Sequence, residues 1–249
     1  MRTAAIVPAA GRGERLGPGL PKALRALGGA PLLAHAVRAL ARSRAISLVV
    51  VAAPDDGVSD VRAMLMGHHA GAELAVVAGG ASRQDSVRLA LAALPEDVEA
   101  VLVHDAARPL TPVELIDAVA AAVHAGADAV VPGLRVTDTV KRVRAGPAGT
   151  VGETLVETVV ETVDRRSLRA VQTPQGFRRS VLAAAHLAAG EGGTDGDEAQ
   201  STDDAGLVER LGRCVIVIPG SEDAFKVTRP IDLDLAEAVL ARRRTDGVR

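Results

Sequence analysis

The chain has 249 residues, of which 48% are hydrophobic and 24% charged, a composition typical of globular rather than disordered proteins. A formal net charge of −2 and an aromatic content of 1% argue against a nucleic-acid partner, because both a basic field and stacking side chains are lacking. With no apolar stretch of about 20 residues and no signal-peptide layout, the sequence predicts a cytoplasmic protein without a membrane partner.

Short β-branched runs alternate with Ala- and Leu-rich stretches of helical spacing. The runs predict strands at Ala4–Pro8, Ile46–Ala52, Glu73–Val77, Ala100–His104, Asp128–Pro132 and Val215–Pro219. The stretches predict helices at Leu32–Arg42, Asp85–Leu94, Pro112–Ala125 and Ser180–Ala189. This order predicts an α/β, Rossmann-like fold with a mostly parallel mixed sheet and helices on both faces, in a single domain over residues 1–249. Right-handed crossovers would place the strand ends, and with them the site, along one edge.

Two segments interrupt this alternation. Residues 137–169 are rich in Val and Thr around a turn at Gly146–Gly149, and they predict a protruding β-arm, although a Glu-Thr repeat of period four would also fit a helix. Gly190–Ser201 is rich in Gly, Asp and Glu and predicts a loop. Near the last strand, the apolar surroundings of the single cysteine, Cys214, predict a buried and inert thiol.

The first predicted strand runs directly into a loop of small residues followed by cations. Small residues let a backbone approach a nucleotide, and successive N–H groups can hold phosphate oxygens whose charge Arg15 and Lys22 would neutralise. Leu16 stands where a dinucleotide-binding fingerprint needs Gly or Ala, and no Gly-Lys-Ser/Thr sequence makes a Walker A loop. A glycine-rich turn with solvated cations is the simpler alternative.

With Val7 before it and Pro21-Lys22 after it, the loop Pro8-Ala9-Ala10-Gly11-x-Gly13-x-Arg15 resembles the signature of nucleotidyltransferases. More narrowly, it resembles the 2-C-methyl-D-erythritol 4-phosphate cytidylyltransferase family of the non-mevalonate isoprenoid pathway. Further segments resemble the family in the same order, namely Gly79–Val87, His104–Pro109, Asp138–Lys141, Val163–Arg165, Gln172–Gln175, Thr202–Ala205 and Ala224–Leu233. The resemblance implies that CMP passes from CTP to methylerythritol 4-phosphate and that pyrophosphate is released.

The resemblance also implies roles for individual residues. CTP would be bound by Pro8, Ala9, Ala10, Gly11, Gly13, Gly80, Ala81, Ser86 and Ala106. The cations around the reacting phosphate would be Arg15, Lys22 and Lys226. The acceptor would be bound by Asp105, Arg108, Thr139, Arg165, Thr173 and Thr202, with Thr139 and Arg165 reaching from the arm into the neighbouring subunit of a homodimer. Asp105 would lie near Mg²⁺, either directly or through water.

Each motif also has a purely structural interpretation. Ser82 or Asp85, and Thr202 or Asp203, could be helix caps, and Pro230 could begin the last helix. Asp105 and Arg108 could pair to close a loop. The six histidines show no metal-ligand spacing with acidic partners. No Gly-x-Ser-x-Gly motif occurs, so covalent catalysis by a protein side chain has no candidate residue.

Other functions remain open at this stage. A cytidylyltransferase for another polyol phosphate, such as ribitol 5-phosphate, shares nearly all these motifs. A dinucleotide-dependent oxidoreductase is disfavoured by Leu16. A catalytically silent nucleotide-binding regulator is disfavoured because Arg15, Lys22 and Lys226 are all present.

Overall fold

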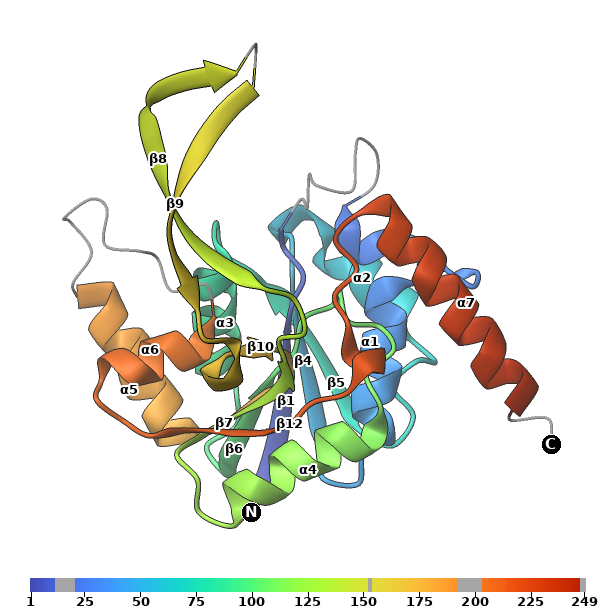
Figure 1. Cartoon of the computed structure of the whole chain (residues 1–249). Coiled ribbons are helices and arrows are strands. Elements are labelled where there is room, and N and C mark those ends of the chain that lie inside the picture. The colour runs from blue at the N-terminus through green and yellow to red at the C-terminus, as the bar shows by residue number, and fades with distance from the viewer. Residues whose placement is uncertain (12–20, 152–153, 192–202, 247–249) are drawn as a thin grey trace.

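The computed structural model describes residues 1–11, 21–151, 154–191 and 203–246. Its centre is a mixed sheet with the strand order β10-β7-β11-β6-β1-β4-β5, in which β12 also pairs with β7 (Figure 1). The strands are β1 (Arg2–Pro8), β4 (Leu48–Ala53), β5 (Glu73–Ala78), β6 (Val98–Val103), β7 (Ala129–Arg135), β10 (Arg169–Val171), β11 (Gln175–Arg178) and β12 (Val215–Pro219). The helices are α1 (Leu32–Arg42), α2 (Val58–Leu65), α3 (Arg83–Ala92), α4 (Val113–His124), α5 (Arg179–Glu191), α6 (Asp204–Arg210) and α7 (Pro230–Asp246).

The predicted α/β fold is confirmed. Every predicted strand and helix is present, and the ends differ by at most three residues. Strands β6, β1, β4 and β5 run parallel, whereas β11 lies antiparallel between β6 and β7. The mixed character of the sheet therefore comes from β10 and β11, two short strands that the sequence analysis did not predict.

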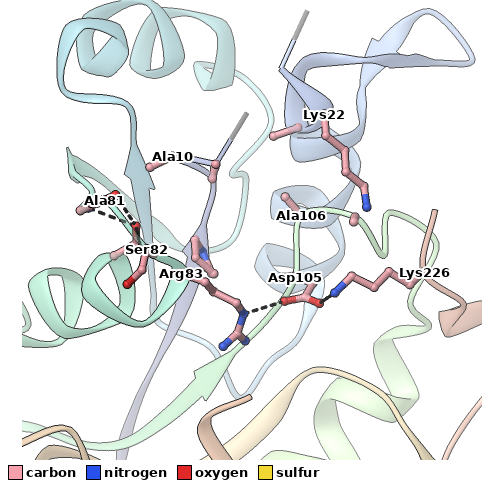
Figure 2. A pocket seen from close by; sticks show the side chains of 15 residues that line it. Ala10, Lys22, Ala81, Ser82, Arg83, Asp105, Ala106 and Lys226 are labelled. Atoms are coloured by element: carbon pink, nitrogen blue, oxygen red, sulfur yellow. Dashed lines mark hydrogen bonds and ion pairs between the residues drawn. The ribbon is translucent and has the colours of Figure 1, made fainter. Parts of the chain in front are cut away.

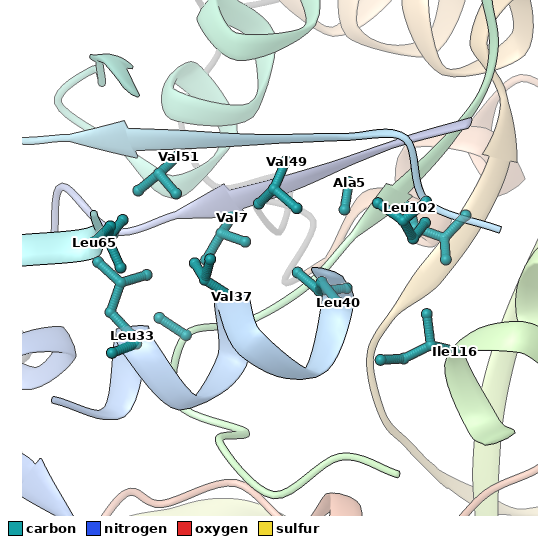
Figure 3. Packing of buried hydrophobic residues seen from close by; sticks show 14 of the residues in the cluster. Ala5, Val7, Leu33, Val37, Leu40, Val49, Val51, Leu65, Leu102 and Ile116 are labelled. Carbon is teal, nitrogen blue, oxygen red and sulfur yellow. The ribbon is translucent and has the colours of Figure 1, made fainter. Parts of the chain in front are cut away.

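Alternate residues of the central strands face two different helical layers, because successive side chains of a strand point to opposite faces. From β1, Ala5 and Val7 pack with α1, α2 and α4 (Figure 3). From the same strand, Ala4 and Ile6 pack with α3, α5 and α6. Burial on both faces explains why these strands appear as continuous apolar runs in the sequence.

The last helix, α7, packs beside the sheet rather than on the centre of either face. Its residues Ala236 and Val239 form a separate apolar cluster with Leu27, Leu32 and Val227. This cluster fixes the segment that precedes α7, because Val227 is fully buried and its N–H donates to the carbonyl oxygen of Ala107. The C-terminal segment is thereby held against the loop that follows β6.

The predicted arm is a long antiparallel hairpin. Its strands are β8 (Val140–Val151) and β9 (Thr154–Val163), which pair with each other and project from the body of the protein (Figure 1). The preference for strands over a helix is confirmed. Val159 and Val160 lie on the hairpin with more than half of their surface exposed.

Two sequence interpretations need correction or completion. Cys214 is exposed rather than buried, because β12 pairs only with β7 among the described strands and presents much of its length to solvent. Strand β11 escaped prediction because it is short and contains glycine, which is unfavourable in strands. A Cβ on Gly176 would lie 2.6 Å from Cγ1 of Val119, so the glycine lets α4 cross β11 closely.

In the described ranges, no helix combines the length and the apolar character that crossing a membrane requires.

The core of the sheet predicts a large difference between two leucine truncations. Leu102 of β6 is fully buried between the helical layers, whereas Leu187 of α5 is 65% exposed. We expect Leu102→Ala to lower the free energy of unfolding by about 2–5 kcal/mol. We expect Leu187→Ala to change it by about 0.5 kcal/mol or less. Urea denaturation of both variants measures this, and equal losses would contradict the described packing.

Candidate functional site

Three loops meet at the carboxyl edge of the parallel strands. Each loop follows one strand, and its first residue extends the backbone hydrogen bonding of that strand to the neighbouring strand. The bonds run from the backbone N–H to a backbone carbonyl oxygen, from Ala9 to Ala52, from Gly79 to Ala53 and from His104 to Ile6. Strand β1 is the point where the chain order reverses, since β4 and β5 follow on one side and β6 on the other. A ligand site in this kind of sheet forms outside such a point.

A pocket of about 250 Å³ lies at this edge (Figure 2). It is lined by Pro8, Ala9, Ala10, Gly11, Lys22, Ala23, Gly80, Ala81, Ser82, Arg83, Ser86, Asp105, Ala106, Ala107 and Lys226. Most of the residues predicted to bind the nucleotide or the reacting phosphate are therefore gathered around one cavity.

Two glycines allow the loop after β5 to approach its neighbours. A Cβ on Gly79 would lie 2.6 Å from Cβ of Ala10, which belongs to the loop after β1. A Cβ on Gly80 would collide with Cβ of Asp85 in the first turn of α3. A larger residue at Gly79 would push the loop after β5 away from the loop after β1. The small residues Gly79 and Ala10 therefore allow the two loops to lie close together at the pocket.

Two serines hold the same loop in shape. The hydroxyl of Ser82 accepts from the N–H of Asp85, which confirms the predicted cap at the start of α3. The hydroxyl of Ser86 accepts from the N–H of Gly80 at 3.1 Å and lies 2.9 Å from the Ser82 carbonyl oxygen, to which it donates. Ser86 thus fixes the backbone between Gly80 and Ser82. Its predicted contact with a base stays a prediction.

Asp105 lies between two cations in the pocket. One carboxylate oxygen is 2.7 Å from Nζ of Lys226, and the other is 3.3 Å from Nε of Arg83 (Figure 2). Burial alone would raise the pKa of Asp105, but the charges of Arg83 and Lys226 outweigh it and hold this pKa well below its usual range. The carboxyl group is therefore charged at neutral pH.

Arg83 is also held from behind the pocket. Its Nη1 atom lies 2.7 Å from Asp204, which begins α6 and is 1% exposed at its side chain. Burial would lower the pKa of Arg83, but Asp204 and Asp105 raise it above its ordinary value. The other oxygen of Asp204 accepts from Nε2 of His186 on α5 at 3.0 Å.

Thr173 holds the backbone of Asp105. Its hydroxyl oxygen accepts from the Asp105 N–H and also lies within 3.0 Å of Nδ1 of His104. Burial lowers the pKa of His104 to about 4, so the ring is neutral at pH 7. Because Nε2 of His104 must donate to the carbonyl oxygen of Arg108, Nδ1 is the acceptor and Thr173 donates to it. The hydroxyl thus accepts one hydrogen bond and donates another within the protein, and its predicted contact with an acceptor stays a prediction.

Three other residues predicted to bind the acceptor, Arg108, Thr139 and Arg165, do not line this cavity. Arg108 is buried, and its Nη1 atom donates to the carbonyl oxygen of Ala224 at 2.6 Å. Thr139 and Arg165 are exposed near the base of the hairpin, where Arg165 donates to the carbonyl oxygen of Thr137. Their predicted contacts with an acceptor stay predictions. Gly13, Arg15 and Thr202 lie outside the described residues.

Arg83 and Asp204 are the charged residues of this site that the sequence analysis did not single out. Both were part of recognised segments, but each was considered only as a neighbour of a possible helix cap. The position of Arg83 did carry a signal, because a charge in the first turn of a helix after a strand end lies close to the site edge. Asp204 offered no such signal, since α6 follows α5 rather than a strand. The cap by Asp203, which accepts from the Gly206 N–H, is confirmed.

The charges of the pocket suit a phosphorylated ligand. Lys22 and Lys226 line the cavity, and the chain has only one further lysine, Lys141, among its 29 basic residues. Asp105 is the single carboxylate among the described lining residues. Nowhere in the described ranges do three or more His, Cys, Asp or Glu side chains gather as a metal site. The donor set therefore fits a cation that is held mainly by the oxygens of a ligand.

Comparison with known sequences points to one family. The family model described as 2-C-methyl-D-erythritol 4-phosphate cytidylyltransferase matches residues 3–242. A protein of that name from Streptomyces coelicolor is 60% identical over 99% of this chain and 88% of its own. One from Streptomyces avermitilis is also 60% identical, over 99% of this chain and 95% of its own.

Solved structures of the same kind share the fold. The 2-C-methyl-D-erythritol 4-phosphate cytidylyltransferase from Thermus thermophilus is 35% identical, with a TM-score of 0.71 over 96% of this chain and 98% of its own. The 4-diphosphocytidyl-2C-methyl-D-erythritol synthase from Anaerococcus prevotii is 26% identical, with a TM-score of 0.78 over 96% of each chain.

The contacts of Thr173 predict that its hydroxyl stabilises the fold of the site. We expect Thr173→Val, which keeps the shape but leaves two buried polar partners unpaired, to lower the free energy of unfolding by about 1–3 kcal/mol. Thr173→Ser should restore most of the loss, and Thr245→Val on the exposed end of α7 is the surface control. Urea denaturation measures all three. A valine variant as stable as the wild type would contradict the hydrogen bonds described.

Proposed function

Because the chain belongs to the 2-C-methyl-D-erythritol 4-phosphate cytidylyltransferase family, we infer that it transfers CMP from CTP to 2-C-methyl-D-erythritol 4-phosphate and releases pyrophosphate. The product is the CDP-alcohol of isoprenoid precursor synthesis. The observation that supports this most directly is the pocket at the edge of β1, β5 and β6, where Lys22 and Lys226 lie near a glycine-dependent loop.

The reaction needs charge stabilisation more than it needs a base. An oxygen of the acceptor phosphate attacks the α-phosphorus of CTP, and the bond from that phosphorus to the bridging oxygen of the pyrophosphate breaks. A phosphomonoester has a second pKa of about 6, so its oxygen is already anionic at neutral pH. The protein must therefore bring two polyanions together and stabilise the charge that develops on the transferring group.

Lys22 and Lys226 both line the pocket and are placed to supply this charge from the side that also carries Ala106 and Asp105 (Figure 2). Lys22 begins a short turn, Lys22–Leu24, that precedes the first helix. Lys226 precedes Val227, whose backbone bond to Ala107 fixes the segment beside Asp105. We assign the transferring phosphate to the space between the two lysines, with Arg15 as the third cation.

The loop between Gly79 and Ser82 is the proposed site of the cytosine ring. Gly80, Ala81 and Ser82 line the pocket, and the hydroxyl of Ser86 bonds to the backbone on either side of Ala81. Backbone carbonyls that accept from an exocyclic amine favour cytosine over uracil, since uracil would leave them unpaired. The packing of Ala106 at the pocket wall suits the ribose.

Mg²⁺ is the divalent cation that we propose for this reaction. It prefers oxygen ligands and is commonly bound by one or two carboxylates together with substrate phosphates. Asp105 is the residue that would hold it, directly or through water, and the remaining ligands would be oxygens of the triphosphate. The chemistry it supplies there is neutralisation of the phosphate charge.

The arm is proposed to complete the acceptor site of a second subunit. Thr139 and Arg165 are exposed near the base of the hairpin and outside the cavity of their own chain. A guanidinium can bind a phosphate through two parallel hydrogen bonds, which suits Arg165 for the acceptor phosphate. The homodimer and the expected cytoplasmic location are parts of this proposal.

The inferred reaction is tested by pyrophosphate release from CTP and Mg²⁺ in the presence of either methylerythritol 4-phosphate or ribitol 5-phosphate. We expect release with the first acceptor and little with the second. Release with ribitol 5-phosphate alone would keep the mechanism but change the substrate. A folded protein that binds CTP and releases pyrophosphate with neither acceptor would overturn the inference.

The position of Lys22 predicts a large loss of rate when its charge is removed. We expect Lys22→Ala to lower kcat by about 10²-fold, as observed when other charge-stabilising donors are removed. Arg44→Ala, which removes one positive charge before β4 at the opposite edge of the sheet, is the control and should keep its rate. Steady-state pyrophosphate release measures both. A folded Lys22→Ala protein with near-normal turnover would refute the assigned role.

The arm predicts that two impaired variants complement each other when the acceptor is kept well below the KM of either one. We expect Arg165→Ala to raise KM for the acceptor, whereas Arg166→Ala, whose guanidinium pairs with Asp164, should not. When Arg165→Ala and Lys22→Ala subunits are mixed and allowed to exchange, about half of the dimers hold one intact site, so about a quarter of the wild-type rate should return. A mixture no more active than its parents would exclude an arm that acts across the dimer.

A further inference from the structure

A chain of alternating charges leads from the pocket into the interior of the protein. Lys226 contacts Asp105, Asp105 contacts Arg83, Arg83 contacts Asp204, and Asp204 accepts from His186. The first three residues line the pocket, whereas the last two are buried behind it. This series of ion pairs and hydrogen bonds therefore connects Lys226, at the reacting end of the site, to α5 and α6.

Arg83 is fixed more firmly than a solvent-exposed arginine would be. Two different nitrogen atoms of its guanidinium are engaged, Nε by Asp105 and Nη1 by Asp204. Because the guanidinium is planar, holding two of its nitrogens sets the plane of the whole group. The contact to the buried carboxylate of Asp204 is the shorter one, at 2.7 Å, so we take Asp204 as the group that fixes the position of the Arg83 guanidinium.

The two cations on Asp105 have different consequences for catalysis. Lys226 is 39% exposed at its side chain and must reach the reacting phosphate. If Asp105 had no second cation, its full charge would act on Lys226 alone and hold the ammonium away from the phosphate. Sharing the carboxylate with Arg83 weakens that hold.

We propose that Arg83 is a positioning residue: anchored by Asp204, it orients the carboxylate of Asp105 for the acceptor and leaves Lys226 available to the transferring phosphate. The proposal rests on the proposed function, because it assigns Asp105 and Lys226 to the same reaction. It adds a role for Asp204 and His186, which do not line the pocket yet set its charge geometry.

A double-mutant cycle separates this role from a purely structural one. Arg83→Gln leaves Asp204 buried without its cation, so its melting temperature should fall by about 6 °C or more. In Arg83→Gln/Asp204→Asn both charges are gone, and most of that loss should be recovered. We expect catalysis not to recover with stability: kcat/KM for the acceptor should stay about tenfold or more below wild type, while the Kd of CTP changes much less.

Two further variants sharpen the comparison. Asp204→Asn alone can still accept from His186 but removes the charge opposite Arg83, and it should lower kcat/KM for the acceptor in the same way. Asp128→Asn is the matched control, because Asp128 also pairs with two arginines, Arg178 and Arg213, but at the opposite edge of the sheet. Its kinetic constants should equal those of the wild type. Arg83→Lys should restore part of the rate by keeping the positive charge.

The outcomes divide clearly. If the double variant regains both stability and kcat/KM, Arg83 acts only on folding and the proposal is wrong. If Asp204→Asn has wild-type constants for the acceptor, the anchoring role is wrong. The wild-type rate measured in the same series tests the proposed function separately from either result.

A crystal structure of Asp204→Asn gives a readout that needs no turnover. Released from its buried partner, the guanidinium of Arg83 should move towards Asp105 and shorten the contact that is now 3.3 Å. An unmoved Arg83 would overturn the proposal even for a protein that used a different acceptor.

Discussion

Asp105 carries a negative charge that must be neutralised from two sides, because its side chain is largely enclosed at the end of β6. Charging an enclosed carboxylate is costly unless cations and hydrogen bonds compensate. Lys226 and Arg83 supply the cations, and the hydroxyl of Thr173 holds the backbone of the same residue. Much of the surrounding architecture serves to bring these three residues together: α3 carries Arg83, the segment before α7 carries Lys226, and the link between β10 and β11 carries Thr173.

Close approach of the backbone is the second constraint on the site. Gly79 fits against Ala10 only because neither residue carries a larger side chain, and this contact joins the loops after β5 and β1. The same principle acts at Gly176, where β11 passes under α4. Since β11 lies between β6 and β7, this short strand joins β7 to the parallel strands that carry the site.

The sequence predicted the parallel part of the sheet well because strands buried on both faces leave long apolar runs. Helix α1 was predicted to the residue, since its apolar spacing is uninterrupted. The antiparallel strands β10 and β11 could not be predicted in this way, because their pairing depends on β6 and β7, which are distant in the chain. Cys214 was misplaced for a related reason: an apolar run does not reveal whether its strand lies at the centre or at the edge of a sheet.

The pocket residues were predicted largely through motifs, whereas the ion pairs behind them were not. A motif records which residues recur together, but the 2.7 Å contact between Arg83 and Asp204 joins segments 121 residues apart. The hydrogen bonds of the Thr173 hydroxyl could not be predicted from its motif either, because its partners, His104 and Asp105, follow a different strand. Long-range electrostatics of this kind emerges only when the chain is folded.

The scarcity of lysine gives the pocket a distinctive chemical reactivity. Arginine guanidinium groups remain protonated and do not act as nucleophiles near neutral pH, so side-chain amines are the principal targets of acylating and Schiff-base-forming reagents. Two of the three lysine amines of this protein, those of Lys22 and Lys226, line one cavity. A reagent that carries an aldehyde on a phosphate-bearing scaffold would therefore meet a site where the attracting charge and the reacting group coincide, whereas the one lysine outside the pocket, Lys141, lies on the exposed arm.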